Sequence, residues 1–173
     1  MRIRPARAAD IPGVARLYDC IHTEEEEGRA CIGWLRGVYP TAETAGAALG
    51  RGDLYVLEEN GTVLSAAVIN AIQPDGYDRG AWRYPAQEGQ VLVLHTLVVD
   101  PAAAGRGLGR RFVAFYEDLA RKTGRPFLRM DTNEKNGRAR RLYAALGYRE
   151  AGTVPTVFNG IPGVNLVLLE KKL

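Results

Sequence analysis

The stretch from residue 97 to residue 111 decides the fold of this chain, and it reads Leu97-Val98-Val99-Asp100-Pro101-Ala102-Ala103-Ala104-Gly105-Arg106-Gly107-Leu108-Gly109-Arg110-Arg111. An apolar strand ends at the proline, and a glycine-rich turn then opens a helix. The alternating glycines predict positive φ angles, which let backbone N–H groups approach an anion without Cβ atoms in the way. The helix N-terminus and the arginines add positive charge at the same point. The stretch is therefore predicted to hold a diphosphate.

Two common phosphate-binding motifs do not fit this turn. A P-loop requires Gly-Lys-Ser/Thr after its second glycine, and the sequence contains no such triplet. The fingerprint G-x-G-x-x-G fails because the sixth position is Arg110 when counted from Gly105, and Phe112 when counted from Gly107. Nucleoside triphosphates and NAD are therefore disfavoured as ligands.

A second motif follows and reads Asn136-Gly137-Arg138-Ala139-Arg140-Arg141-Leu142-Tyr143-Ala144-Ala145-Leu146-Gly147-Tyr148. Its apolar positions recur at helical spacing, Asn136 stands before the helix, and Gly147 closes it. With an apolar strand beginning at Pro126 between them, the two motifs resemble the GNAT superfamily of acyl-CoA-dependent N-acetyltransferases over roughly residues 90 to 150.

The resemblance implies an α/β (α+β) fold in which a mixed, splayed central sheet is flanked by helices, in the order β-α-α-β-β-β-α-β-α-β-β. It also implies acetyl-CoA as cosubstrate, no metal, and direct attack of a primary amine on the thioester. One position departs from the family, whose turn usually begins with Gln or Arg where this chain has Ala104. Because the turn binds mainly through backbone amides, the interpretation stands, and Arg106 or Arg110 is expected to compensate.

The resemblance also assigns residues to the cofactor. The central strand would pair its backbone with the pantetheine arm through Leu97 and Val99, and the N–H of Val98 would stabilise the oxyanion. Asn136 would hold a pantetheine amide, or serve only as the cap of its helix. The diphosphate would be bound by the turn residues Gly105, Arg106, Gly107, Leu108, Gly109 and Arg110.

Tyr143 is the candidate general acid. It follows Asn136 at the spacing that the family uses to reach the CoA sulfur, and a phenol with a pKa of about 10 can protonate a thiolate. The alternative is a core residue, since Tyr143 lies on the apolar stripe of its own helix.

His95, on the central strand, is the candidate base, because an imidazole with a pKa of about 6.5 accepts a proton near neutral pH. It is expected on the same face of the strand as Leu97 and Val99. The alternative is a structural histidine, and the rival bases are Asp131 and the run Glu24–Glu27.

The composition is that of an ordinary globular chain: 173 residues, 46% hydrophobic and 25% charged, which predicts a single domain over residues 1–173. No long apolar run is present, and Met1–Arg7 lacks a following apolar segment, so neither a membrane span nor secretion is expected. Cys20 and Cys31 have no metal-binding spacing and are expected as free thiols, which favours the cytoplasm.

Charge is unevenly spread along the chain. Residues 101–149 carry 12 Lys or Arg against 4 Asp or Glu, whereas the rest of the chain carries 11 against 16. The excess of positive charge coincides with the predicted diphosphate site. Nucleic acid is a weaker interpretation, because the basic segment lacks interleaved aromatics and Glu24–Glu27 would repel phosphate.

Patterning along the rest of the chain predicts further elements. A strand is expected at Arg2–Arg4, a helix capped by Asp10 runs to Ile21, and a weaker helical region passes Trp34 and resumes at Thr41–Leu49. Asn60-Gly61 between two apolar runs predicts a hairpin of 54–58 and 63–69. The buried central strand covers 91–99, and further apolar patterns predict a helix ending before Gly124 and a strand at 164–170.

The loop between residues 73 and 89 is long, which is typical of a functional loop. Its aromatic residues Tyr77, Trp82 and Tyr84, together with the acidic run, are candidates for binding a cationic acceptor.

The leading functional hypothesis is an N-acetyltransferase that acts on a primary amine, with a small molecule favoured over a protein N-terminus or lysine. A non-catalytic acyl-CoA-binding domain is the opposing class, because fold does not fix function. A homodimer is left open.

Overall fold

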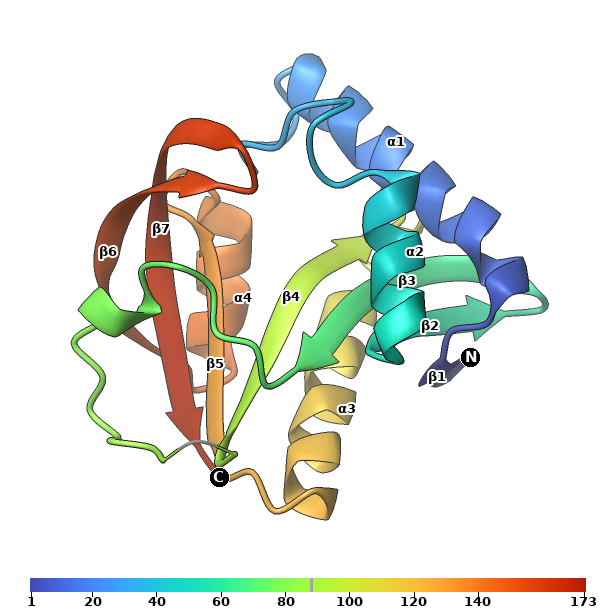
Figure 1. Cartoon of the computed structure of the whole chain (residues 1–173). Coiled ribbons are helices and arrows are strands. Elements are labelled where there is room, and N and C mark those ends of the chain that lie inside the picture. The colour runs from blue at the N-terminus through green and yellow to red at the C-terminus, as the bar shows by residue number, and fades with distance from the viewer. Residues whose placement is uncertain (88) are drawn as a thin grey trace.

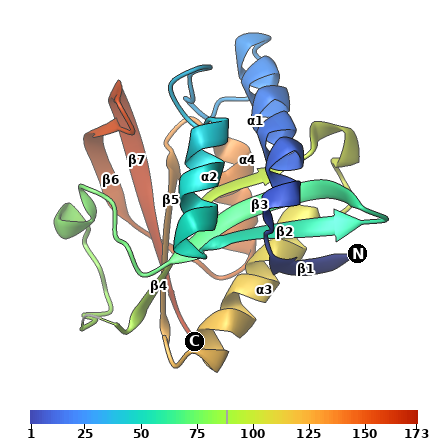
Figure 2. The same ribbon diagram turned by 45° about the vertical axis from the view of Figure 1, so that its right-hand side comes forward.

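The described residues form a seven-stranded sheet with helices on both faces (Figures 1 and 2). The structure is a computed structural model that describes residues 1–87 and 89–173. Its elements are β1 (Arg2–Pro5), α1 (Ile11–Glu26), α2 (Ala42–Arg51), β2 (Leu54–Glu59), β3 (Thr62–Asn70), β4 (Val91–Val99), α3 (Leu108–Lys122), β5 (Phe127–Asn133), α4 (Gly137–Ala145), β6 (Arg149–Phe158) and β7 (Ile161–Lys172). This order confirms the predicted fold.

The local signals act where they were predicted. Asn60 and Gly61 take positive φ angles of 50° and 79°, which is the geometry of a tight turn that matches the twist of the flanking strands. Thr41 caps α2 with its side chain, and Gly52 ends this helix in the left-handed region.

The strand order is β1-β2-β3-β4-β5-β7-β6, and β4–β5 is the parallel pair within it. These two strands pair only from Val91 with Phe127 to Leu94 with Met130, although β4 runs on to Val99 and β5 to Asn133. They lie side by side near the foot of Figure 1 and separate toward its top. The sheet is therefore splayed at its centre, as predicted.

Two hydrophobic clusters cover the two faces of this sheet. On one face, α3 and α4 pack side chains such as Phe112 and Tyr143 onto Leu94 and Met130. On the other face, α1 and α2 pack onto Val68, Ala66 and Val98. A third cluster buries Val91 and Val93 of β4 against Tyr77 and side chains of β6 and β7. Both faces of β4 are thus covered along its length, which explains why this strand is apolar throughout.

Two local predictions are wrong, and a third element is confirmed with wider bounds. Residues 30–38 are not helical but form a loop with an isolated bridge between Leu35 and Tyr39. Asp10 does not cap α1 with its side chain, because its carboxylate accepts hydrogen bonds from the Arg4 guanidinium and the Arg7 backbone N–H. The strand at the end of the chain is longer than its apolar core, since β7 begins at Ile161.

Candidate functional site

A cavity of about 1210 Å³ passes through the splayed centre of the sheet. Its lining includes Ala47 and Arg51 from α2 on one face, and Leu108 and Arg110 from α3 on the other. We call the part between α1, α2 and β4 the acceptor limb, and the part beside the N-termini of α3 and α4 the phosphate limb. Two molecules that enter from opposite faces can therefore meet where β4 and β5 diverge.

The glycine turn lies at the mouth of the phosphate limb. Gly105 and Gly107 have φ angles of 81° and 71°, which are left-handed values that favour glycine. Gly109 differs from the prediction: it lies inside α3, where an added Cβ would stand 3.4 Å from Leu142 Cδ2. Its absent side chain therefore allows α4 to pack closely, rather than shaping the turn.

The arginines of the turn separate into two roles. Arg110 lines the cavity. Arg106 lies outside the cavity lining in the described residues, and its Nη2 pairs with Glu59 Oε2 at 2.7 Å across the β2–β3 hairpin. The position of Arg106 therefore does not support the expectation that it binds phosphate, because its side chain is paired with Glu59.

A bulge in β4 changes which way the following residues face. The register with β3 shifts between Ala66 and Val68, and Thr96 takes a φ of 51°, which is unusual for a β-branched residue. His95 is paired with Val68 and shares the acceptor-limb face with Val98, whereas Leu97 and Val99 pack on the α3 face. The prediction that His95 shares a face with Leu97 and Val99 is wrong, because the extra residue inverts the alternation.

The register also decides which backbone groups of β4 face the opening. Asp100 N donates to Leu64 O at 2.9 Å, and the Ser65 hydroxyl reaches Val98 O at 2.5 Å. By the alternation of an antiparallel ladder, the N–H of Val98 points to β3, away from the opening. The N–H groups of Leu97 and Val99 point to the opening instead. The N–H of Val98 is therefore taken up by β3, whereas those of Leu97 and Val99 remain available to a ligand in the opening.

Tyr143 projects from α4 into the cavity lining and is 6% exposed. Its ring packs edge-on against Tyr148, and its hydroxyl has no hydrogen-bond partner among the described residues. Burial, and then the negative charge of Asp131, raise the pKa of Tyr143 above its ordinary value. Its hydroxyl is therefore protonated at neutral pH.

Asp131, near the end of β5, also lines the cavity where the strands diverge. Its Oδ2 accepts a hydrogen bond of 2.8 Å from the Tyr77 hydroxyl, and no cation pairs with it among the described residues. Burial raises the pKa of Asp131 to about 6, against the opposing effect of the Tyr77 hydrogen bond. A carboxylate tuned close to neutral pH is therefore available beside Tyr143.

His95 is partly buried in the wall of the acceptor limb, and its Nε2 lies 2.9 Å from Asn70 Oδ1. Burial lowers the pKa of His95 to about 4. The imidazole is therefore neutral at pH 7, but it binds a proton more weakly than Asp131 does.

Asn136 caps α4, because its Oδ1 accepts from Ala139 N at 3.1 Å. It also lines the cavity, so its side-chain N–H₂ group remains as a donor toward a ligand. Capping and ligand binding are thus compatible in this residue.

The carboxylates of the acidic run Glu24–Glu27 form hydrogen bonds and ion pairs with the loop that follows it. Glu25 accepts from the backbone N–H groups of Ile32 and Gly33, and Glu26 pairs with Arg36. Glu24 and Glu27 both pair with Arg29. All four carboxylates are therefore engaged by residues 29–36, and Glu24 is the one of the run that lines the cavity.

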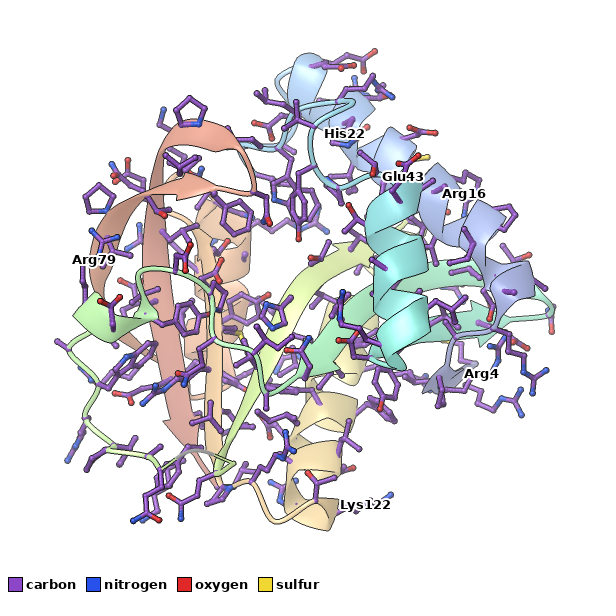
Figure 3. The ribbon with its side chains drawn as sticks, in the orientation of Figure 1. Arg4, Arg16, His22, Glu43, Arg79 and Lys122 are labelled. Carbon is purple, nitrogen blue, oxygen red and sulfur yellow. The ribbon has the colours of Figure 1, made fainter. Side chains whose placement is uncertain are left out.

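The aromatic side chains of the loop between residues 73 and 89 pack against the protein rather than facing a ligand site. Tyr77 is buried and bonded to Asp131, and Trp82 lies over the Arg129 guanidinium at 4.1 Å. Arg79, labelled at the outer edge of the molecule in Figure 3, donates to Pro155 O at 2.8 Å. Of the described residues of this loop, 73–75 line the cavity, so its aromatic residues do not form the predicted cation site.

In residues 1–87 and 89–173, no group of three or more His, Cys, Asp or Glu side chains is arranged to hold a metal ion. Over the same residues, no helix has the length and apolar character needed to cross a bilayer.

A sheet that splays between its parallel strands, with a glycine turn at the N-terminus of α3, is the arrangement that the resemblance to acyl-CoA-dependent N-acetyltransferases implied. The model of the Acetyltransferase (GNAT) family matches residues 17–148, and the chain belongs to this family. Acetyl-CoA is the cosubstrate of GNAT acetyltransferases.

Among curated proteins, the chain is 31% identical over 105 residues to the L-methionine sulfoximine/L-methionine sulfone acetyltransferase of Salmonella typhimurium. That match covers 60% of this chain, and the chain spans about half the length of the relative, 54%.

Solved structures share the fold over nearly the whole chain. A GNAT acetyltransferase from Streptococcus agalactiae superposes with a TM-score of 0.81 at 24% identity, covering 99% of this chain and 95% of that one. Ribosomal-protein-alanine N-acetyltransferase from Brucella melitensis gives 0.73 at 22%, with both chains covered completely. The yncA protein of Salmonella typhimurium, solved with its cofactor acetyl-CoA, gives 0.70 at 22%, covering 100% and 94%.

Proposed function

We propose that this chain transfers the acetyl group of acetyl-CoA directly to the primary amine of a small molecule. The observation that carries the proposal is the cavity, which is lined from both faces of the sheet and has Tyr143 and Asp131 in its wall where β4 and β5 separate. Donor and acceptor bound in opposite limbs would meet there without a covalent enzyme intermediate.

The enclosure of the acceptor limb supports a small molecule over a protein acceptor. Tyr39, from the α1–α2 loop, packs edge-on against Trp34 at 5.8 Å and against Phe158 at 5.4 Å between ring centroids. Phe158 ends β6, so the loop and the β6–β7 hairpin touch across the limb, as the top of Figure 1 shows. An extended peptide would have to separate them. The curated relative is named for small amino-acid derivatives, which agrees with this choice.

In the proposed reaction, Asp131 receives a proton from the ammonium form of the acceptor, and the neutral amine attacks the thioester carbonyl. The Tyr77 hydrogen bond occupies Oδ2, so Oδ1 is the oxygen that takes the proton. We assign Asp131 rather than His95 to this step, because the carboxylate has a pKa of about 6 and the imidazole a pKa of about 4.

The carbonyl oxygen becomes an oxyanion, and the N–H of Leu97 is the donor that we assign to it. The C–S bond then breaks, and Tyr143 gives its proton to the leaving thiolate. The nitrogen of the new amide loses its second proton, which restores the tyrosine, and Asp131 passes the first proton to solvent. The products are the N-acetylated amine, CoA with its thiol, and one proton.

The cofactor would lie in the phosphate limb. The backbone of Leu97 and Val99 would pair with the pantetheine arm, and the amide of Asn136 would donate to it. The diphosphate would bind the N–H groups of residues 105–109, with Arg110 adding a guanidinium.

The proposal is tested by mixing the protein with acetyl-CoA and a panel of small primary amines and short peptides, and by following release of the CoA thiol. Acetylated small amines, identified by mass, are the expected result. Acetylation of peptides alone would move the assignment to a protein acceptor. Saturable acetyl-CoA binding without turnover of any amine would leave the opposing hypothesis, a non-catalytic acyl-CoA-binding domain.

A further inference from the structure

Four side chains in and behind the wall of the acceptor limb form a continuous hydrogen-bonded chain that the acetyl transfer does not require. Arg51 ends α2, Asp53 precedes β2, Asn70 ends β3, and His95 lies in β4. Asn70 Nδ2 donates to Asp53 Oδ2 at 2.7 Å, and His95 Nε2 lies 2.9 Å from Asn70 Oδ1. Arg51 Nε donates to Asp53 Oδ2 at 2.9 Å.

The hydrogen bonds of this chain fix its directions. Because the Asn70 amide gives its N–H₂ to a carboxylate, its Oδ1 must accept, and it does so from the backbone N–H of Ile72 at 2.9 Å as well as from His95. His95 therefore carries its proton on Nε2. Asp53 is only 7% exposed, so its carboxylate takes its hydrogen bonds from these partners.

The Asp53 carboxylate binds one edge of the Arg51 guanidinium. Its Nε and Nη2 bond to the two oxygens of Asp53, at 2.9 Å and 3.3 Å. Within residues 1–87 and 89–173, Nη1 and the second hydrogen of Nη2 have no partner. The side chain is 47% exposed and lines the cavity. A guanidinium fixed in one plane with free N–H groups is suited to a carboxylate.

The other cations in the cavity lining lie apart from Arg51: Lys135, Arg138 and Arg141 stand at or near the N-terminus of α4, in the phosphate limb. Arg29 is paired with Glu24 and Glu27. Arg110 stands in the phosphate limb, beside the glycine turn. Asp75 is an exposed carboxylate in the same lining, so the attraction at Arg51 comes from directed hydrogen bonds rather than from an excess of positive charge.

We infer that Arg51, positioned by Asp53 and Asn70, binds a carboxylate of the acceptor, so that the acceptors are amino acids rather than simple alkylamines. The inference rests on the proposed function and deepens it. The limb then complements a zwitterion: Asp131 faces the ammonium group, and Arg51 faces the carboxylate.

The test compares acceptors that differ only in the carboxylate: L-methionine sulfone, its carboxamide, and 3-(methylsulfonyl)propylamine. Wild-type protein is expected to prefer the amino acid. Arg51→Gln is expected to raise KM for the amino acid by roughly 10- to 100-fold, which is the value of a charge-assisted pair. The kcat for the amino acid, and the KM for each of the two acceptors without a carboxylate, should stay unchanged. Arg51→Lys keeps the charge but loses the fork and is expected to recover only part of the preference.

Arg121→Gln is the matched control, since Arg121 is an exposed arginine on α3 outside the cavity lining. Equal effects of Arg51→Gln on all three acceptors, or no effect on any, would overturn the inference and leave the proposed function standing.

A calorimetric titration of the same three compounds into the CoA-bound protein separates the two proposals. Without turnover of any amine, binding of the amino acid that is lost in Arg51→Gln still supports the carboxylate site while the proposed function fails. Absence of amino-acid binding in the wild type overturns the inference directly.

Discussion

Replacing Asp131 by asparagine is expected to stabilise the folded protein at neutral pH while it removes activity. Burial raises the pKa of Asp131 from 3.8 to about 6 on folding. The folded chain therefore holds this proton more tightly than the unfolded chain, and stability is lost as the pH rises from about 4 through 6. The difference of roughly two pKa units corresponds to at most about 3 kcal/mol.

The asparagine side chain would stay neutral at every pH and would still accept the Tyr77 hydrogen bond, so Asp131→Asn avoids this loss. We expect the variant to be more stable than the wild type at pH 8 by about 1–3 kcal/mol, which raises Tm by roughly 3–10 °C. Near pH 4 the wild-type carboxyl is protonated, and the difference in Tm should vanish.

Thermal unfolding at pH 4.5 and pH 8 measures this, with Asp75→Asn as the matched control, because Asp75 lines the same cavity but is exposed. A difference in Tm between wild type and Asp131→Asn that is the same at both pH values would refute the reasoning, since it would show that the Asp131 charge costs nothing.

The same carboxylate sets the expected pH dependence of the reaction. Wild-type kcat/KM should rise with pH and level off above about 6, and Asp131→Asn should lower kcat by roughly 10²- to 10⁴-fold. His95→Ala should keep the rise near pH 6. If instead His95→Ala abolishes that rise and Asp131→Asn retains it, His95 is the base, as the sequence first indicated.

Three further predictions concern the donor half of the site. Tyr143→Phe should lower kcat by roughly 100-fold and leave the Kd of acetyl-CoA unchanged, measured by steady-state kinetics and calorimetry; a fully active variant would reduce Tyr143 to a core residue. Gly107→Ala forces a side chain into a φ of 71° at a cost of roughly 1–2 kcal/mol, and it should weaken acetyl-CoA binding more than it lowers Tm. Arg110→Gln should weaken acetyl-CoA binding by roughly 10- to 100-fold, whereas Arg106→Gln should leave it nearly unchanged; the reverse order would show that Arg106 leaves Glu59 when the cofactor binds.

The sequence by itself determined the order of the elements, the β2–β3 hairpin and the cap of α4. These features depend on short-range causes that can be read from neighbouring residues. Asn60-Gly61 favours one turn geometry, Asn136 can accept from an N–H group one turn away, and Gly105 and Gly107 permit the left-handed backbone that the turn adopts. The family resemblance rests on two of these segments, the glycine turn and the helix that Asn136 caps.

Only the tertiary structure decided the direction and partners of the side chains in the site. One inserted residue at Thr96 turned His95 to the other face of β4, and the pairing with β3 took up the N–H of Val98. Arg106 forms an ion pair with Glu59, which lies 47 residues earlier in the chain. No local pattern encodes such choices, because strand register and ion pairing depend on segments that meet only after folding.

The raised pKa of Asp131 and the fixed guanidinium of Arg51 have the same origin. The sequence does not show whether a carboxylate in a strand faces water or a cavity. Burial beside Tyr77 is what raises the pKa of Asp131 to about 6. Arg51 gains its orientation from Asp53 and Asn70, which lie in two other segments of the chain. The sequence thus determined the order of the elements and the glycine turn. The tertiary structure decided which side chains of the cavity have unpaired hydrogen-bonding groups or shifted pKa values.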